Sequence, residues 1–352
     1  MEVSLSKSRK WTRVWLLLAP IVLASLVIAG CGSSGNSASG TNADSTDAPS
    51  TTSNELVIML NGPLSDPFFG SMKQGADAAA KALGVNYQYV APPNLNNFEP
   101  EYTTLIQQAI GRHPDAMVVG NFIPSAFDSL IKEATSAGIP VVVNNTGLES
   151  WEEDGAITFV GASPQQMGES DGEAAGRAGV KNLLCVNHAP VNPALGEQCD
   201  AAKKALEADG GTAETLNIPT ADSENPSAVT QDIEGFLASH SEVDGIQTLG
   251  SSIAEASQAA IRNQGKEGDI IIGGSDVSTA SLNSVKNGEM AWLADQQGYL
   301  QGYDSLQVAV QYARYKIHPT KPIETGGLMI EKSNVDEVLA VQEANPGLRG
   351  AR

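Results

Sequence analysis

Polar and aromatic side chains follow closely on three short apolar runs of this sequence. The group consists of Asp66, Phe68, Phe69, Asn144, Asn145 and Asp276. A flat phenylalanine face can cover the apolar C–H surface of a pyranose or furanose, while a carboxylate accepts hydrogen bonds from two hydroxyls. An amide both donates and accepts, which suits a vicinal diol. These residue types therefore predict a binding site for a small polyhydroxy molecule.

Each of these residues also has a purely structural interpretation. Asp66 precedes Pro67 and can cap a helix, because a carboxylate there accepts backbone N–H groups and complements the helix dipole. One of the two phenylalanines can pack beneath that helix as a core residue. The asparagines can form an Asx turn at a strand end, and Asp276 can cap the segment that follows it.

Four further polar residues extend the candidate site. Asn192 and Gln198 lie on the loop and helix after the run NLLCVN, and Asp295 and Gln296 follow the run MAWLA. We expect them to reach the same ligand. Trp292, within MAWLA, is expected in the core, since a tryptophan in a strand more often packs inside the protein than stacks on a ligand.

The sequence argues against catalysis. It has no Gly-x-Ser-x-Gly turn, no His-Glu-x-x-His pair and no Gly-x-x-x-x-Gly-Lys-Ser/Thr loop. Its histidines, His113, His188, His240 and His318, lack metal-ligand spacing. His188 lies near Cys185, but a thiol within an apolar strand is expected to be inert. We therefore expect that the protein is not an enzyme and that it has no metal site and no cofactor.

Cys185 and Cys199 form a candidate disulfide. Cys185 lies about two residues before the end of NLLCVN and Cys199 about five residues into the next helix, so both lie roughly 7 Å from the intervening turn. A bridge would close a loop of about 15 residues and stabilise the fold by ~3 kcal/mol. A helix and a sheet usually pack about 10 Å apart, which exceeds the Cα separation of a disulfide. Two reduced core thiols therefore stay an alternative.

Composition excludes several classes of protein. The 352 residues carry 21 Lys and Arg against 41 Asp and Glu, a formal net charge of −20. Nucleic-acid binding depends on clustered basic side chains that neutralise phosphate, so no nucleic-acid partner is expected. The length predicts about two domains, each large enough to bury a core.

Residues 1–30 have the layout of a secretory signal. Basic side chains from Lys7 to Arg13 precede an uncharged apolar run over residues 14–29, which is shorter than the roughly 20 residues of a spanning helix. The run ends in Ile28-Ala29-Gly30-Cys31, which resembles the bacterial lipoprotein box. That resemblance implies cleavage before Cys31, lipidation of its thiol and a membrane anchor, the alternative being an ordinary signal with an incidental cysteine. Residues 31–53 are almost without apolar side chains and are expected to be a flexible linker.

From residue 55 onward, apolar runs alternate with stretches of helical period. The runs are LVIML, VNYQYV, DAMVVG, IPVVVN and ITFVG, then NLLCVN, TAETLNI, DGIQTLG, DIIIGGSD, MAWLA and GLMIEK. This alternation predicts βαβ units and parallel sheets, and two doubly wound units fit the length. The segment after Asp276 would be surplus to two consecutive units, so we expect the chain to cross between them more than once.

Several segments resemble type I periplasmic binding proteins of the ribose and sugar group. The run LVIML with Ser65-Asp66-Pro67-Phe68-Phe69 resembles their beginning, and residues 115–119 and 137–141 resemble their third and fourth strands. Gly274-Ser275-Asp276 stands where the family has Gly-x-Asp, and residues 295–303, DQQGYLQGY, resemble its hinge return. The resemblance covers about residues 55 to 332 and rests on the order and spacing of these motifs.

This resemblance implies an α/β fold of two doubly wound parallel-sheet lobes with three hinge crossovers. The N-terminal lobe would comprise residues 54–162 and 297–324, and the C-terminal lobe residues 163–296 and 325–352, with the ligand between them. The family commonly has Asp-Arg where this chain has Asn145-Thr146, and often an arginine at the position of Gln198. Without these bidentate cationic donors, a neutral polyol is favoured over a carboxylate or phosphate ligand.

The sequence thus predicts an extracytoplasmic, lipid-anchored and monomeric receptor. It would capture a small polar ligand, a sugar or polyol, close about its hinge and deliver the ligand to the permease of an ABC importer. One alternative is a receptor for a nucleoside, a furanosyl signal or an amino acid. Another is a sensing subunit that reports its ligand to a membrane kinase or chemoreceptor.

Overall fold

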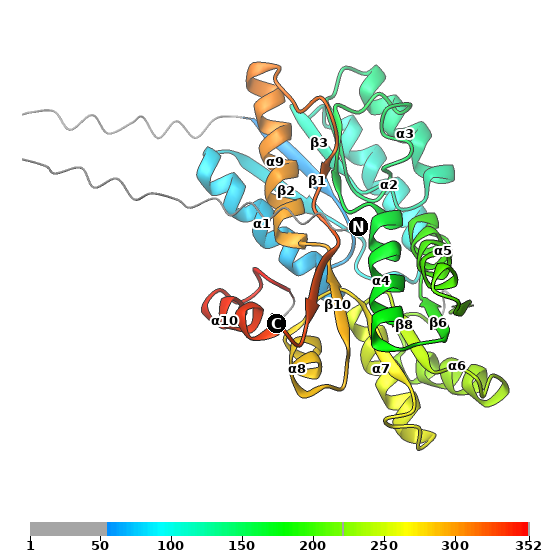
Figure 1. Ribbon diagram of the computed structural model, residues 1–352. Coiled ribbons are helices and arrows are strands. Elements are labelled where there is room, and N and C mark those ends of the chain that lie inside the picture. Colours follow the sequence, from blue (N-terminus) through cyan, green and yellow to red (C-terminus); the bar gives the residue numbers. More distant parts are fainter. Residues whose placement is uncertain (1–54, 220–221, 351–352) are drawn as a thin grey trace, which may run out of the picture. The chain divides into compact units, whose positions relative to one another are not determined.

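The computed structural model describes residues 55–219 and 222–350 of the protein. These residues form two six-stranded β-sheets (Figure 1). The strands of the first sheet are β1 (Leu56–Leu60), β2 (Asn86–Val90), β3 (Ala116–Val119), β4 (Val141–Asn145), β5 (Thr158–Gly161) and β11 (Ile323–Glu324). Those of the second are β6 (Asn182–Asn187), β7 (Thr212–Asn217), β8 (Gly245–Thr248), β9 (Ile271–Ser275), β10 (Trp292–Asp295) and β12 (Leu328–Glu331). We call the part of the chain built on each sheet a lobe.

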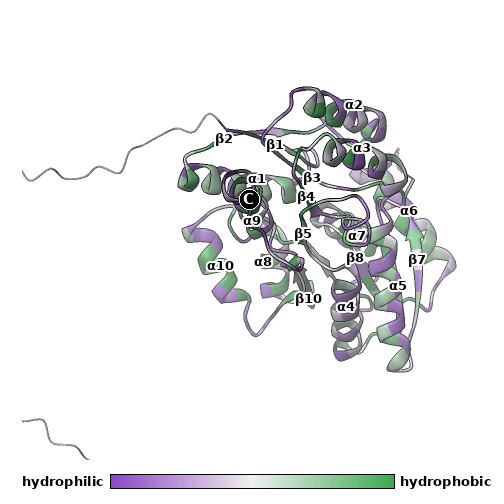
Figure 2. Cartoon of the chain, turned by 90° about the horizontal axis from the view of Figure 1, so that it is seen from above, coloured by the Kyte–Doolittle hydropathy of each residue, from purple (hydrophilic) through white to green (hydrophobic). Residues whose placement is uncertain are grey.

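Helices cover both sheets and connect their strands. With the first sheet lie α1 (Pro67–Leu83), α2 (Phe98–Gly111), α3 (Pro124–Ser136) and α9 (Gly298–Tyr315). With the second lie α4 (Pro164–Ala178), α5 (Pro193–Ala208), α6 (Pro226–Ser239), α7 (Ser251–Asn263), α8 (Thr279–Asn287) and α10 (Val335–Ala344). The helices carry apolar as well as polar residues (Figure 2), and their apolar side chains join the two main cores. Among the described residues, no helix has both the length and the apolar character needed to cross a membrane.

Local sequence explains where these elements begin. Four helices start with an Asp, Ser or Asn cap followed at once by proline, as in Asp66-Pro67 and Asn192-Pro193. The cap side chain accepts a backbone N–H, and proline suits the first helical position because its missing N–H would have no helical partner. The central strands, such as β3 and β4, are buried along their whole length, as expected for parallel strands covered on both faces.

The two sheets share one topology. Their strand orders are β11-β5-β4-β3-β1-β2 and β12-β10-β9-β8-β6-β7, and the paired strands are parallel except that β12 runs antiparallel to β10. The chain passes between the sheets after β5, after β10 and after β11. This confirms the predicted fold class of two doubly wound lobes with three crossovers.

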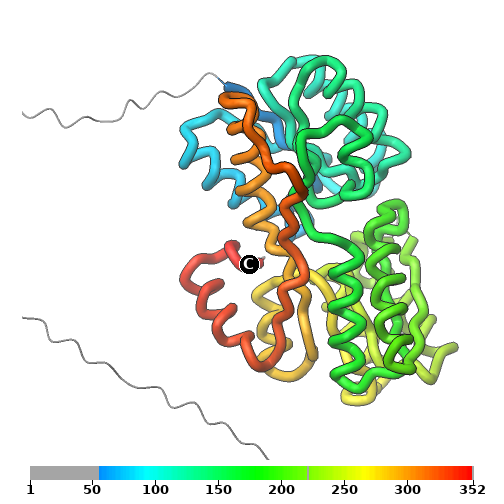
Figure 3. The backbone as a smooth tube through the Cα atoms, turned by 45° about the horizontal axis from the view of Figure 1, so that its top comes forward, coloured from blue at the N-terminus to red at the C-terminus, as the bar shows by residue number. Residues whose placement is uncertain are grey.

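Thr325 ties the three crossover segments together. Its backbone N–H donates to the carbonyl of Gly161 at 2.9 Å, and its hydroxyl donates to the carbonyl of Gln296 at 3.0 Å. Its own carbonyl accepts from the side-chain amide of Gln297. Figure 3 shows the green and orange crossover segments running together between the lobes. The hinge therefore consists of three crossover segments that are joined to one another by hydrogen bonds.

Helices α1 and α9 cross at a pair of glycines. A methyl group on Gly75 would overlap the backbone carbonyl of Tyr299, and one on Gly302 would overlap the carbonyl of Met72. Only glycine lets the two backbones approach this closely. The crossing holds α9, which arrives after β10 of the second sheet, on the first lobe.

We expect Gly75→Ala to lower the free energy of unfolding by about 2 kcal/mol or more, because backbone must shift to admit the methyl group. Gly70→Ala is the matched control in the same helix, since no atom lies within 4 Å of a methyl group there. That change should raise stability by about 0.5–1 kcal/mol through helix propensity. Urea denaturation followed by circular dichroism measures both, and equal effects would contradict the close crossing.

Candidate ligand-binding site

Two adjoining cavities lie where the strand order of each sheet reverses, between β1 and β3 and between β6 and β8. Open α/β sheets bind ligands at such points. The first cavity has a volume of about 120 Å³ and the second about 240 Å³. They share the lining residues Asn145, Asn192, Leu195 and Gln296. They are therefore two parts of one cleft, whose size suits a small molecule.

An aromatic wall of Phe68, Phe69, Phe98 and Phe122 lines the first cavity. The ring centroids of Phe68 and Phe69 lie 5.3 Å apart, and those of Phe69 and Phe122 lie 5.9 Å apart. Phe98 and Phe122 are separated by 5.3 Å, and all three pairs meet edge to face. This geometry is favourable for aromatic pairs and fixes the wall before any ligand arrives.

Sequence reasoning found half of this wall and missed Phe98 and Phe122. Phe122 comes three residues after β3, so the rule that pointed to Asn145 at the end of β4 applies to it as well. Gly120 leaves the space that the Phe122 ring occupies, because a methyl group there would overlap the ring. Phe98 is the first residue of α2, and no strand-end rule points to it.

Asn145 and Asp276 hold matching positions at strand ends of the two lobes. Asn145 ends β4, Asp276 follows β9, and both line the first cavity. Their φ angles of 65° and 72° are left-handed, a conformation that Asn and Asp tolerate better than most residues. Asn145 donates to the side-chain oxygen of Gln301 at 3.1 Å, and Asp276 accepts from the amide of Gln296 at 2.7 Å. Each lobe thus presents one polar group to the cavity from a turned strand end.

Asp66 and Asn192 each cap a helix and also line the cleft. Asp66 accepts from the N–H of Phe68 at 3.0 Å, and Asn192 accepts from that of Ala194 at 3.2 Å. Asp66 borders the first cavity, and Asn192 borders both. The capping interpretation and the site interpretation of Asp66 therefore describe the same side chain.

Asn144 lies outside both cavities, which corrects the expectation that it contacts the ligand. Its side chain is fully buried, donates to the hydroxyl of Ser305 at 2.6 Å and accepts from the amide of Asn61. Successive side chains of a strand point to opposite faces, so its neighbour Asn145 is the one that reaches the cleft. Asn144 instead joins β4 to β1 and α9.

Asp295 is a second correction, because it too lies outside both cavities. Its carboxylate forms an ion pair with Arg349 at 2.8 Å and accepts from the N–H of Gln297 at 2.7 Å. Burial raises the pKa of Asp295, and the guanidinium of Arg349 opposes that rise. Asp295 therefore anchors the C-terminal segment at the hinge, while the adjacent Gln296 lines the cleft.

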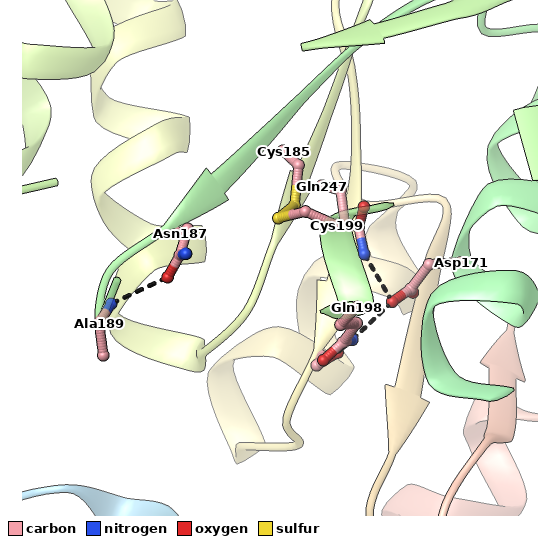
Figure 4. Close-up of a disulfide and its surroundings, with 8 residues drawn as sticks. Asp171, Cys185, Asn187, Ala189, Gln198, Cys199 and Gln247 are labelled. Atoms are coloured by element: carbon pink, nitrogen blue, oxygen red, sulfur yellow. Dashed lines mark hydrogen bonds between the residues drawn. A yellow bond between two sulfur atoms is a disulfide. The ribbon is translucent and has the colours of Figure 1, made fainter. Parts of the chain in front are cut away.

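Gln198 is engaged inside the second lobe and borders only the second cavity. Its amide donates to the carboxylate of Asp171 at 2.9 Å and to the hydroxyl of Ser275. Asp171 also accepts from Gln247 at 2.9 Å and from the indole N–H of Trp292 at 2.8 Å; Figure 4 shows the glutamine bonds. Burial raises the pKa of Asp171 to about 6. Trp292 is a core residue, as predicted.

Cys185 and Cys199 are joined by a disulfide, with their Cα atoms 5.7 Å apart (Figure 4). This Cα separation lies within the range of a disulfide, so the usual spacing of helix and sheet, which was the argument for reduced thiols, does not prevent the bridge. The sulfurs pack with Leu195 and Leu249, and both leucines line the first cavity. The bridge thus ties the start of α5, with Asn192 before it, to β6 directly behind the wall of the cleft.

The sequence matches the periplasmic binding protein domain over residues 57–317. The chain belongs to this family. The xylose/arabinose-binding protein XylF of Sulfolobus acidocaldarius is 23% identical over 80% of this chain and 72% of that protein. The ribose import binding protein RbsB of Bacillus subtilis is 25% identical, over 68% of this chain and 75% of that protein. A carbohydrate transporter from Acidothermus cellulolyticus 11B, solved with myo-inositol, is 28% identical and superposes with a TM-score of 0.76 over 84% of this chain and 99% of that one.

The described lining of the cleft of this periplasmic binding protein contains carboxyl groups but neither lysine nor arginine. Burial, with a contribution from Glu224, raises the pKa of Asp66 to about 6. Burial, followed by repulsion from Asp66, raises the pKa of Asp276 to about 8. In the described ranges, no three His, Cys, Asp or Glu side chains are grouped to hold a metal ion.

His188 is a lining residue of the binding protein that sequence reasoning considered only as a partner for Cys185. It follows β6 and borders the first cavity. Burial lowers its pKa to about 4, so the imidazole is neutral at physiological pH. Its Nδ1 atom is buried and makes no hydrogen bond to the described residues. The strand-end position again was the available signal.

We expect Asp276→Asn to stabilise the ligand-free binding protein more at pH 8 than at pH 5. The pKa of Asp276 rises from 3.8 to about 8, so the folded state holds a proton that the unfolded state releases between these values. Stability is therefore lost as pH increases through this window, and asparagine removes the loss while tolerating the left-handed φ. The gain at pH 8 should be on the order of 1–3 kcal/mol.

Thermal denaturation of the wild type and the variant at both pH values measures this difference. Asp336→Asn, which removes an exposed carboxylate on α10, serves as the control for total charge. A gain that is the same at both pH values would show that the Asp276 carboxyl does not titrate in this range.

Proposed function

We propose that this protein captures a sugar or polyol in its interlobe cleft, as a monomer, and delivers it to an ABC importer. The observation that carries this proposal is one cleft lined from both lobes, with an aromatic wall on one side and polar groups at the strand ends. A phenylalanine wall can cover the C–H face of a sugar or cyclitol ring. Amide and carboxyl groups such as Asn145 and Asp276 can then bind the hydroxyls at its edge.

The relatives support the same ligand class. The names of two curated relatives specify xylose or arabinose and ribose, and the structural relative from Acidothermus cellulolyticus holds myo-inositol. All are small, ring-forming polyhydroxy compounds, which fits the volume of this cleft. The absence of lysine and arginine from the described lining disfavours an anionic ligand.

Hinge closure is the proposed mechanism of capture. The lobes meet across the mouth of the cleft, where the N–H of Leu95 in the first lobe donates to the carboxylate of Glu224 in the second at 3.0 Å. A ligand that contacts both lobes stabilises this closed arrangement, because its affinity is higher for the closed than for the open state. The closed surface would then be the form that docks on the permease.

Calorimetric titration with a panel of monosaccharides and cyclitols tests the proposal. At least one member should bind, and Phe122→Ala should weaken its binding roughly tenfold through loss of stacking. Tyr315→Ala, which removes an exposed aromatic side chain at the end of α9, should leave affinity unchanged. If the wild type binds no member of the panel, the sugar or polyol assignment is refuted.

We also propose that Cys31 carries the lipid that holds the protein on the outer face of the cell membrane. Cys31 and the signal segment before it lie outside the described residues, and the support is the sequence Ile28-Ala29-Gly30-Cys31 after a basic and an apolar segment. Stable anchoring takes more than one acyl chain, which diacylation of the thiol supplies.

Cys31→Ala should therefore move the protein out of the membrane fraction. Cell fractionation with immunoblotting measures this, and Ser33→Ala is the neighbouring control that should stay membrane-bound. Retention of the Cys31→Ala protein in the membrane fraction would contradict lipidation at this residue.

A further inference from the structure

The charge of the first cavity is unbalanced. Asp66 lines it from the first lobe and Asp276 from the second, and the charge of Asp66 contributes to the raised pKa of Asp276. Asp66 has a backbone N–H as a partner and Asp276 has the amide of Gln296, both of them neutral donors. The guanidinium of Arg349 is paired with Asp295 outside the cavity. No cation of the described chain therefore balances the two acids.

The other charged groups around the pair add to the imbalance. Glu224 contributes repulsion at Asp66, while Asp295 and Asp171 contribute it at Asp276. Among the described residues, the one further titratable side chain that lines the cavity is His188, which burial keeps neutral. Each neighbour that affects the two carboxyl groups is thus an acid or an uncharged group.

The remaining lining favours a cation in the same place. The faces of the aromatic wall carry the negative part of the ring quadrupole, which attracts an ammonium group within about 6 Å. Phe68, next to Asp66 in the chain, belongs to this wall. The imidazole of His188, which is neutral at physiological pH, also lines the cavity and adds no positive charge. Carboxyl groups and aromatic faces therefore make an environment suited to a protonated amine.

We propose that the ligand is an amine-bearing sugar or cyclitol, whose ammonium group binds between the carboxylates of Asp66 and Asp276. This inference rests on the proposed function and names its ligand class more narrowly. The hydroxyls of the same ring face Asn145, Asn192 and Gln296, which line the cleft around the pair. A charged hydrogen bond in a water-poor cavity is stronger than a neutral one, so the ammonium group supplies affinity and specificity together.

A neutral ligand and a cationic ligand would differ in their proton balance. In the ligand-free protein the raised pKa of Asp276, about 8, keeps a proton on this carboxyl at neutral pH. A neutral ring can bind with that proton in place, so its binding exchanges no proton near neutral pH and weakens as pH rises through about 8. An ammonium group favours the ionised form of both carboxyl groups, so its binding releases the proton near neutral pH and weakens when acid protonates the carboxylates.

Titration calorimetry with paired probes tests the proposal. The pairs are D-glucosamine with D-glucose and scyllo-inosamine with scyllo-inositol, and N-acetyl-D-glucosamine keeps the nitrogen without its charge. At about pH 7, at least one amine should bind roughly tenfold or more tightly than its neutral partner. Repeating the titration in buffers of different ionisation enthalpy should reveal proton release with the amine and none with its neutral partner.

Two variants assign the preference to the carboxyl pair. Asp276→Asn and Asp66→Asn keep size, and asparagine retains both the left-handed turn and the helix cap. Each should remove the preference for the amine, while Asp336→Asn, the exposed control on α10, should retain it. Retention of the preference in both cleft variants would overturn the assignment to these residues.

The possible failures are distinguishable. Binding of a neutral sugar or cyclitol with equal or higher affinity than its amine would overturn this inference and leave the proposed function standing. Equal binding of D-glucosamine and N-acetyl-D-glucosamine would overturn it too, because the charge would then contribute nothing. Failure of every probe, charged and neutral, would refute the proposed function together with this inference.

Discussion

The parallel arrangement of the strands is the constraint on which the rest of this structure depends. In a parallel sheet every strand ends at the same edge, and the chain must cross over one face of the sheet to reach the next strand, usually through a helix. Both sheets of this protein open their carboxyl-end edges on a single cleft, so short segments that are far apart in sequence line one cavity. The residues that line the cleft consequently follow strand ends, as Asn145 and Asp276 do, or lie at the start of the next helix, as Phe68 and Phe98 do.

The hinge follows from the same constraint. A chain that fills two separate sheets and returns to each must cross between them, and the three crossings are joined through the backbone and hydroxyl of Thr325. The ion pair of Asp295 with Arg349 adds the C-terminal segment to this region. The proposed closure would be a rotation about these hydrogen-bonded crossover segments, which is the kind of movement that opens and closes a cleft without disturbing either core.

The cleft itself is an unusual environment for charged groups. It removes carboxyl groups from water, places them near one another and offers neutral donors as their partners, which is why the pKa values of Asp66 and Asp276 rise. Its polar residues also take backbone conformations that are rare outside glycine, as Asn145 and Asp276 do. Both features cost stability in the ligand-free protein and are typical of sites whose geometry is set for a partner.

The order of apolar runs and helical stretches by itself determined the fold class, because burial of alternating β-branched strands and amphipathic helices permits few arrangements. Residue type and strand-end position also located Phe68, Phe69, Asn145, Asp276 and Gln296 at the cleft. Only the tertiary structure decided which residue of an adjacent pair lines the cleft. Asn144 bonds to Ser305 in the interior while Asn145 reaches the cleft, and Asp295 forms an ion pair with Arg349, which is distant in sequence, while Gln296 lines the cleft. It also decided the charge of the cavity, because the balance of acids and bases there depends on groups that the folded chain brings together from both lobes.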